Sequence, residues 1–484
     1  MAIVVKKVEP MFTEIRRLVS LENVTIEGLD INTGNNRIVK AERKLQLSFE
    51  AVLNGKLHQI VSKPSLGRFF IHADSKTYEI DNYQAYFGGY NFMDIGAQTF
   101  TMNISAMKDV NEHKGYMRLS IPITRSFWEH NLSTNAIKTE KNYRGGLLIL
   151  KFEEGEVHVF TVMDGNTKQQ YMIVEPQYEV TKDILFNIHY AVATGLGIIT
   201  GTAPFGESYV LVSNNRDFIS YKAVSYYALR ESIRSQYVTF TTNIYWVEST
   251  LRRGEYNKYA LEMITDDKGK VKNALVDWLY EKTYGNLIYN MYKYPEIARA
   301  AFILLDGTDK ALDYQAAIYA VALETLCTKF KGIFEMKFNG IIKNKGTWTR
   351  IRKPMEKTFR NMCQKYDVEN DIVYKIANKI PNLNDISNTD KFNMVLDKLG
   401  LNRMESDDDA MSQRNNLLHG ELVKKTAEDS SDFDDMYYYS LVLHRLCTAI
   451  IFKFAGYNGY LVNNAVLMDR KPACLRREPV LIKI

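Results

Sequence analysis

The sequence predicts an α+β protein in which a β-rich N-terminal domain, built as a sandwich or barrel, precedes an all-α helical bundle. Between residues 40 and 180, short segments alternate apolar with polar residues or are rich in β-branched residues, which is typical of strands. From about residue 270 almost to the end, apolar residues recur at spacings of three and four, which indicates helices with one apolar face. This change of period divides the chain into domains 1–265 and 266–484.

Composition restricts the class of protein. A chain of 484 residues that is 46% hydrophobic can form two or three domains, each with its own core. The net charge is only +5, from 62 basic and 57 acidic residues, so any site for a polyanion must be local. The four cysteines form no CxxC or CxxH pair, which argues against a disulfide framework and a cysteine-rich zinc site.

The cysteine pattern favours a reducing, cytoplasmic location. The first twenty residues contain no apolar run long enough for a signal peptide, and no stretch elsewhere approaches eighteen apolar residues. We therefore expect a soluble protein that does not contact a membrane.

The β-rich part is predicted from seven segments with strand-like patterns. Gly155 lies between two of these segments and tolerates the positive φ that a tight hairpin turn requires. So many closely spaced strands favour an antiparallel sandwich or barrel. The predicted strands are 44–53, 67–73, 100–107, 116–124, 147–152, 156–162 and 170–175.

Residues 181–260 have a mixed pattern, with a helix after Thr181 and extended segments at 208–213 and 237–250. The glycine-rich stretch ATGLGIITGTAPFG follows a helix and precedes a strand, the reverse of the order in a dinucleotide-binding turn. We interpret its Gly195, Gly197 and Gly201 as a tight turn. The sequence contains no P-loop motif.

The helical part is predicted from segments 271–293, 313–330, 371–380, 391–401 and 436–457. The last of these carries an apolar stripe that includes Leu443, Cys447 and Ile450, which indicates packing in a bundle. The acidic run ESDDDA, at 405–410, immediately precedes another helix. We interpret it as a helix N-terminus, where acidic side chains cap free N–H groups, in preference to a divalent-cation site. No metal or cofactor is expected.

Two Arg-x4-His pairs are candidates for chemistry. Arg125 and His130 follow a predicted strand and enter a loop, and we interpret them as an edge arginine and a surface histidine. Arg414 and His419 lie instead in the helical stretch RNNLLHG. About ninety residues earlier, the helical segment YAVALETL places Glu324 on the face of apolar residues, where an unpaired carboxylate is unfavourable.

This combination resembles the ApeA-like branch of the HEPN superfamily, in which a similar Leu-Glu helix precedes a polar Arg-Asn-x-x-x-His-Gly helix and a terminal amphipathic helix. The resemblance covers about residues 300–460. The N-terminal half resembles the corresponding region of ApeA-type proteins more weakly, through its layout and the TGLGIITG segment.

The resemblance implies a metal-independent RNA endonuclease of an anti-phage, abortive-infection defence system. RNA carries its own nucleophile, the 2′-hydroxyl, so the enzyme needs only proton transfer and charge stabilisation at the phosphate. His419 can serve as acid or base near neutral pH, and Arg414 can bind phosphate oxygens. Asn415 and Asn416 would hydrogen-bond the phosphate or the histidine, and Glu324 would orient Arg414.

Five residues of helix separate Arg414 and His419 by about 140° and about 7.5 Å, so the two do not share a face. We therefore expect a homodimer, formed through the C-terminal helices, with a composite site. We also expect Arg414→Ala and His419→Ala to abolish cleavage without harming the fold.

Other interpretations of this motif stay open. Arg414 could pair with nearby acidic residues while His419 merely ends the helix. The helical domain could also be a non-catalytic dimerisation or nucleotide-binding module attached to a ligand-sensing domain, or part of an adaptor.

A cation-rich stretch at 343–365 is a candidate surface for RNA, with tRNA among the possible substrates. Cations that follow a phosphate chain, beside aromatic rings that stack on unpaired bases, are typical of single-stranded RNA sites. Because Gly346 and Pro354 suggest an irregular segment, a solvated loop is the alternative. The N-terminal half is expected to sense a phage-derived protein or nucleic acid. The candidate RNA-binding residues are Lys343, Lys345, Trp348, Arg350, Arg352, Lys353 and Arg360.

Overall fold

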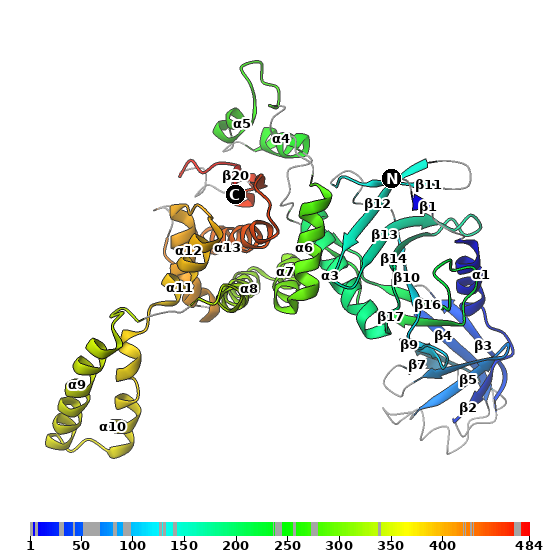
Figure 1. Ribbon diagram of the computed structural model, residues 1–484, viewed down its shortest axis with the longest axis horizontal. Helices are drawn as coiled ribbons and strands as arrows, with labels where there is room; N and C mark the ends of the chain where they lie inside the picture. The colour runs from blue at the N-terminus through cyan, green and yellow to red at the C-terminus, as the bar shows by residue number, and fades with distance from the viewer. Residues whose placement is uncertain are drawn as a thin grey trace.

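The computed structural model describes most of the chain and shows a large antiparallel β-sheet region followed by a helical region (Figure 1). The predicted α+β class is therefore confirmed. The described residues are 3–4, 8–28, 33–41, 44–51, 68–80, 85–90, 98–124, 128, 132–138, 143–235, 237, 244–254, 258–272, 279–336, 340–419, 421, 423–425, 428, 430–468 and 476–484.

The main sheet has twelve strands among the described residues, and its neighbours are antiparallel except for the parallel pair β1 and β11. In spatial order its strands are β1 (Ile3–Val4), β11 (Asn135–Lys138), β12 (Tyr143–Lys151), β13 (Glu156–Met163), β14 (Gln170–Pro176), β10 (Tyr116–Ile123), β16 (Glu207–Ser213), β17 (Ala223–Ala228), β9 (Ala106–Asp109), β6 (Lys76–Ile80), β5 (Phe69–Ala73) and β2 (Thr25–Glu27).

A second sheet contains β3 (Thr33–Ala41), β4 (Lys44–Ala51), β8 (Gln98–Ile104) and β7 (Ala85–Tyr90) in that order. Among the described residues there are also two short pairs of strands: β15 (Thr202–Ala203) with β18 (Ile233–Arg234), and β19 (Tyr460–Val462) with β20 (Leu481–Lys483). Every segment predicted as a strand between 44 and 175 contributes to one of the two larger sheets.

Both faces of the main sheet are covered. Successive side chains of a strand point to opposite faces. In β16, Tyr209 and Leu211 join a core shared with the second sheet and with α1 (Glu9–Leu18), whereas Val210 and Val212 join a core shared with the helices. Consecutive apolar residues in this strand therefore fill two separate cores, and the sheet is a middle layer.

The hairpin predicted around Gly155 is present between β12 and β13. Gly155 has φ +149°, and its carbonyl accepts a 2.9 Å hydrogen bond from the backbone N–H of Phe152. The turn therefore uses a backbone conformation that glycine adopts without strain.

Helix α3 (Lys182–Thr200) begins at Thr181, as predicted, but the turn interpretation of the glycine-rich stretch is wrong for two of its three glycines. Gly195 and Gly197 lie inside α3. A Cβ at Gly195 would lie 2.7 Å from Ile288 Cγ1, and one at Gly197 would lie 2.6 Å from Leu305 Cδ1. These glycines allow close helix packing, and only Gly201, at φ +77°, ends the helix.

Helix α3 is also the one described helix whose length and hydropathy would suit a membrane span. Two thirds of its most apolar stretch is buried within the protein. It packs on the sheet, on α6 (Glu281–Lys293) and on α7 (Pro295–Asp306). One apolar core therefore contains residues from both sides of position 265.

The extended segment predicted at 237–250 is wrong where the structure describes it, because α4 (Ile244–Arg253) is a helix. Its aromatic and β-branched residues favoured a strand, and tertiary packing of Val247 and Leu251 overrides that preference. Helix α5 (Lys258–Ile264) follows, and the polar stretch at 265–270 forms a turn, with Gly269 at φ +70°.

The C-terminal bundle consists of α8 (Leu312–Ile333), α11 (Asn388–Leu399), α12 (Glu405–His419) and α13 (Asp432–Phe454), with α7 beside them and short α14 (Asn464–Leu467) after them. Helix α13 is central: every residue from Tyr438 to Phe452 is buried, including the predicted stripe from Leu443 to Ile450. It packs against α8, α12, α7 and α11.

An arm projects from the bundle between α8 and α11 (Figure 1). It consists of α9 (Lys345–Lys365), α10 (Asn370–Ala377) and the short 3-10 helix η6 (Ile380–Asn384). The alternative of an irregular, solvated loop is wrong here, since α9 is a 21-residue helix with Pro354 inside it. The side chain of Asn344 caps this helix by accepting a 3.0 Å hydrogen bond from the Thr347 N–H.

Candidate functional site

Arg414 and Glu324 form an ion pair between α12 and α8, with 2.9 Å between Nη1 and Oε1. The Nη1 hydrogens do not point at the carboxylate, so the contact is an electrostatic one and not an aligned hydrogen bond. The Arg414 side chain is 5% exposed and that of Glu324 is 42% exposed. The carboxylate therefore stands between a buried guanidinium and solvent.

Two further groups hold the Arg414 guanidinium in place. Its carbon lies 5.0 Å from the centre of the Phe392 ring on α11, and Nη2 donates a 2.6 Å hydrogen bond to Asn415 Oδ1. Its Nε has no hydrogen-bond partner among the described residues. Three helices thus converge on Arg414, and part of its donor capacity is unused.

His419 and Asn415 are both exposed, whereas Arg414 is buried. His419 is the last residue of α12. Asn415 precedes it by four residues, and residues at this spacing are neighbours on a helix surface. The exposed pair is therefore Asn415 with His419, and buried Arg414 contacts one member of this pair by donating a hydrogen bond to Asn415 Oδ1. The spacing of four between Asn415 and His419 is visible in the sequence and predicts this pair more directly than the Arg-x4-His spacing does.

The burial of Arg414 contradicts one expectation. Arg414→Ala was expected to leave the fold intact, yet it would remove a buried side chain that contacts α8 and α11. Arg414 also pairs with distant Glu324, so the alternative that it pairs with nearby acidic residues of α12 is not what the structure shows. The other alternative, that His419 ends its helix, describes its position correctly.

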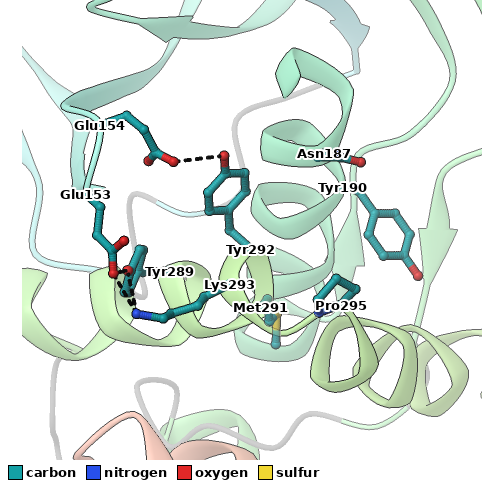
Figure 2. A pocket seen from close by; sticks show the side chains of 9 residues that line it. All are labelled: Glu153, Glu154, Asn187, Tyr190, Tyr289, Met291, Tyr292, Lys293 and Pro295. Atoms are coloured by element: carbon teal, nitrogen blue, oxygen red, sulfur yellow. Dashed lines mark hydrogen bonds and ion pairs between the residues drawn. The ribbon is translucent and has the colours of Figure 1, made fainter. Parts of the chain in front are cut away.

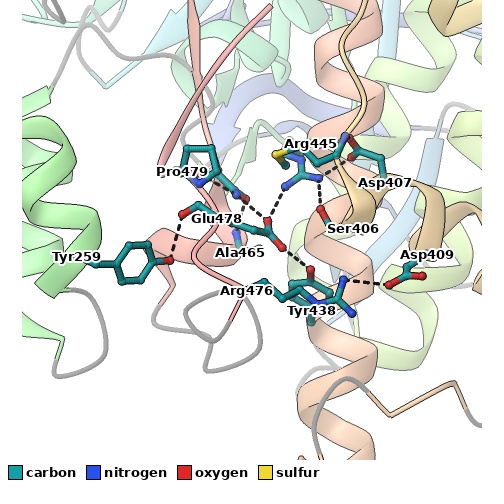
Figure 3. Close-up of polar contacts among 12 residues, drawn as sticks. Tyr259, Ser406, Asp407, Asp409, Tyr438, Arg445, Ala465, Arg476, Glu478 and Pro479 are labelled. Carbon is teal, nitrogen blue, oxygen red and sulfur yellow. Dashed lines mark hydrogen bonds and ion pairs between the residues drawn. The ribbon is translucent and has the colours of Figure 1, made fainter.

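The acidic start of α12 is engaged in ion pairs (Figure 3). Asp407 accepts a 2.9 Å hydrogen bond from the Met404 N–H, as a capping residue does, and its other oxygen lies 2.5 Å from Arg445. Asp409 lies 2.9 Å from Arg476. No cluster of three potential metal ligands occurs among the described residues.

Arg445 is part of a buried polar network that fixes the C-terminal segment (Figure 3). It contacts Asp407 on one side and, at 3.1 Å, Glu478 on the other. Glu478 also accepts hydrogen bonds from Tyr438 and Asn463. These contacts tie the strand-forming tail to α12 and α13, and we assign them a structural role.

The second Arg-x4-His pair, Arg125 and His130, lies outside the described residues.

The candidate RNA-binding cations are only partly brought together. With successive helical residues about 100° apart, the exposed residues Arg350, Lys353, Lys357 and Arg360 fall within a sector about 80° wide. We call this sector the cationic face of α9. Lys345 begins the helix and Lys343 precedes it, both exposed.

Trp348 and Arg352 do not share the cationic face. Arg352 falls about 20° from buried Cys363 and lies 3.2 Å from Glu356 on the same helix, and Trp348 falls about 60° from Cys363. The expected interleaving of aromatic rings with cations is therefore absent from this face.

A cavity of about 350 Å³, not anticipated from the sequence, lies where the β12–β13 turn meets α3 and α6 (Figure 2). Glu153, from the turn, lies 2.6 Å from Lys293 and accepts a hydrogen bond from the Tyr289 hydroxyl. The bond from Lys293 holds the pKa of Glu153 below its usual value. Tyr190 and Tyr292 contribute aromatic walls.

No family model, no curated protein and no solved structure matches this chain.

Proposed function

We propose that the protein is a metal-independent RNA endonuclease of the HEPN type that acts in anti-phage defence. The observation that supports this most directly is the placement of Asn415 and His419 side by side on the surface, above the Glu324–Arg414 pair. The resemblance of residues 300–460 to ApeA-like HEPN proteins supplies the type of reaction.

In the proposed reaction, the 2′-hydroxyl of one nucleotide attacks its own 3′-phosphate. The bond from phosphorus to the 5′-oxygen of the next nucleotide breaks, giving a 2′,3′-cyclic phosphate and a 5′-hydroxyl end. The 2′-hydroxyl loses a proton and the leaving 5′-oxygen gains one, so no metal or other reactant is required. His419 performs one of these two proton transfers.

Asn415 and Arg414 bind the phosphate and stabilise its negative charge. The Asn415 Oδ1 accepts from Arg414, which turns the amide nitrogen of Asn415 away from Arg414 and leaves its N–H groups to donate to a phosphate oxygen. Arg414 adds positive charge beneath that oxygen, and Glu324 holds the guanidinium. The second proton transfer falls to His419 of a second copy in a homodimer, or to water.

The test compares two exposed histidines in the full-length protein. His419→Ala should abolish cleavage of RNA, measured on total RNA and on tRNA with EDTA present, and should abolish growth toxicity. His113→Ala, which alters an exposed histidine in a turn of the β-rich region, should change neither. End-group analysis should find 2′,3′-cyclic phosphates. Cleavage that persists in His419→Ala, or ends carrying a 5′-phosphate, would contradict the proposal.

A non-catalytic module joined to a ligand-sensing domain is the second candidate function, and the cavity beside Glu153 favours it. Its volume is at the lower end of the range for small-molecule sites, and its tyrosines resemble the lining of such sites. Under this alternative, the parent protein does not cleave RNA. A small molecule that binds in the cavity would raise the melting temperature of the parent protein, and Glu154→Ala, which alters a residue that lines the cavity, would remove this rise.

A further inference from the structure

Helix α9 carries a stripe of exposed apolar side chains that no part of the proposed function uses. Ile351 and Met355 are each 41% exposed, Met362 is 47% exposed and Tyr366, at the end of the helix, is 66% exposed. At about 100° per residue they fall within a sector about 60° wide. We call these four residues the apolar stripe.

The apolar stripe lies on the opposite side of α9 from the cationic face, with about 170° between the centres of the two sectors. The side of α9 between them that includes Cys363 packs against α10 and η6. Single exposed apolar residues are ordinary, but four that share one side of a projecting helix are typical of an interaction surface.

We propose that the apolar stripe binds the same stripe of a second copy of this chain, with the two α9 helices antiparallel about a twofold axis that passes between Thr358 and Phe359. This axis places Ile351 opposite Tyr366 of the partner subunit and Met355 opposite Met362 of the partner subunit. All four residues of the stripe then pair across one axis, as an isologous interface requires. The proposal does not depend on RNA cleavage.

The charges at the two ends of α9 favour this direction. Lys343, Lys345 and Arg350 are exposed near the N-terminus, whereas at the C-terminal end and in the turn after it one exposed lysine, Lys365, is outnumbered by exposed Asp367, Glu369 and Asp371. Antiparallel pairing places each basic end beside the partner's acidic end, and the helix dipoles then oppose each other favourably. A parallel pair would place like charges together.

Pairing of the arm would also join two candidate sites in one particle. The arm leaves the bundle after α8, which carries Glu324, and returns before α11, which carries Phe392. Because the cationic faces lie away from the stripe, both stay exposed in the pair and available to a polyanion.

The first test measures the mass of the full-length protein by sedimentation velocity over a wide concentration range. Parent protein should be dimeric, and the double variant Met355→Glu with Met362→Glu should raise the dimer dissociation constant by at least about tenfold. The matched control is Lys353→Glu with Lys357→Glu on the cationic face, which should leave the dimer unchanged. All these positions are exposed, and circular dichroism verifies helix content.

A monomeric parent protein would overturn the proposal. It would also fail if the stripe variant dimerised like the parent, or if the control weakened the dimer equally. These outcomes concern mass alone, so they stay distinct from the outcome of the RNA cleavage assay.

The second test fixes the direction by oxidative cross-linking. Mixed Ile351→Cys and Tyr366→Cys proteins, in a Cys474→Ser background, should form a 351–366 disulfide, and the Cys474→Ser parent should form none. Cross-linking of Ile351→Cys mainly to itself would indicate a parallel pair and overturn the antiparallel arrangement.

Discussion

Replacement of Arg414 by alanine should destabilise the protein measurably, and the structure gives the size of the effect. The variant loses two buried methylene groups, Cγ and Cδ, each worth about 0.8 kcal/mol, and a cation–π contact with Phe392 worth about 0.5–1 kcal/mol. The remaining carboxylate of Glu324 is 42% exposed and can be hydrated, so the full penalty of a broken buried ion pair does not apply. We expect a loss of about 2–3 kcal/mol in the free energy of unfolding.

His419→Ala is the matched control, since it alters an exposed side chain on the same helix. It should change the free energy of unfolding by less than about 0.5 kcal/mol. Urea unfolding followed by circular dichroism measures both values. Arg414→Lys, which keeps a positive charge and most of the buried stem, should lose less stability than Arg414→Ala. If Arg414→Ala proved as stable as His419→Ala, the buried position of the guanidinium would be wrong.

Two further predictions concern packing and pH. Gly197→Ala should lower the free energy of unfolding by about 1–3 kcal/mol, because the new Cβ would lie 2.6 Å from Leu305 Cδ1. Gly285→Ala in α6 adds a Cβ that meets nothing within 4 Å, and it should raise the free energy of unfolding by about 0.5–1 kcal/mol. Thermal melting of the two variants measures both effects. Burial lowers the pKa of His444 to about 4. As the pH falls, the unfolded state takes up a proton on His444 at a higher pH than the folded state does. Protonation of this residue should therefore lower the free energy of unfolding by about 3 kcal/mol between pH 6.5 and pH 4. In urea unfolding measured at several pH values, the free energy of unfolding of His444→Leu should fall less over this range than that of the parent.

The strands between 44 and 175 were predictable because alternation and β-branched residues follow from the geometry of a sheet. The burial of the main sheet on both faces was not predictable. Consecutive apolar residues such as Val210 and Leu211 indicate burial, but they do not indicate which core each residue joins. Gly195 and Gly197 were misinterpreted for a related reason. Local rules assign glycine to turns, whereas here the approach of α6 and α7, distant in sequence, requires its small size.

Helix α9 shows how a single residue can mislead. Pro354 disfavours a helix interior, but the many lysine, arginine and methionine residues around it favour helix, and Asn344 caps its start. The candidate site was predicted in part: Glu324 and Arg414 do meet, a contact expected only through the family resemblance. The burial of Arg414 could not be predicted, because α12 has no strong apolar face and its packing depends on α8 and α11.

The close approach of α3 to α6 and α7 affects how the two halves of the chain can communicate. A fragment that starts at residue 266 would lack α3 and would leave Leu287, Ile288 and Leu305 exposed to water. Such a fragment should aggregate, so an isolated C-terminal half is a poor substitute for the whole protein. At Gly195 and Gly197, α3 packs directly on α6 and α7. A conformational change in the sheet would therefore reach the bundle as a small shift of helices that stay in contact, and not as a separation of the two halves.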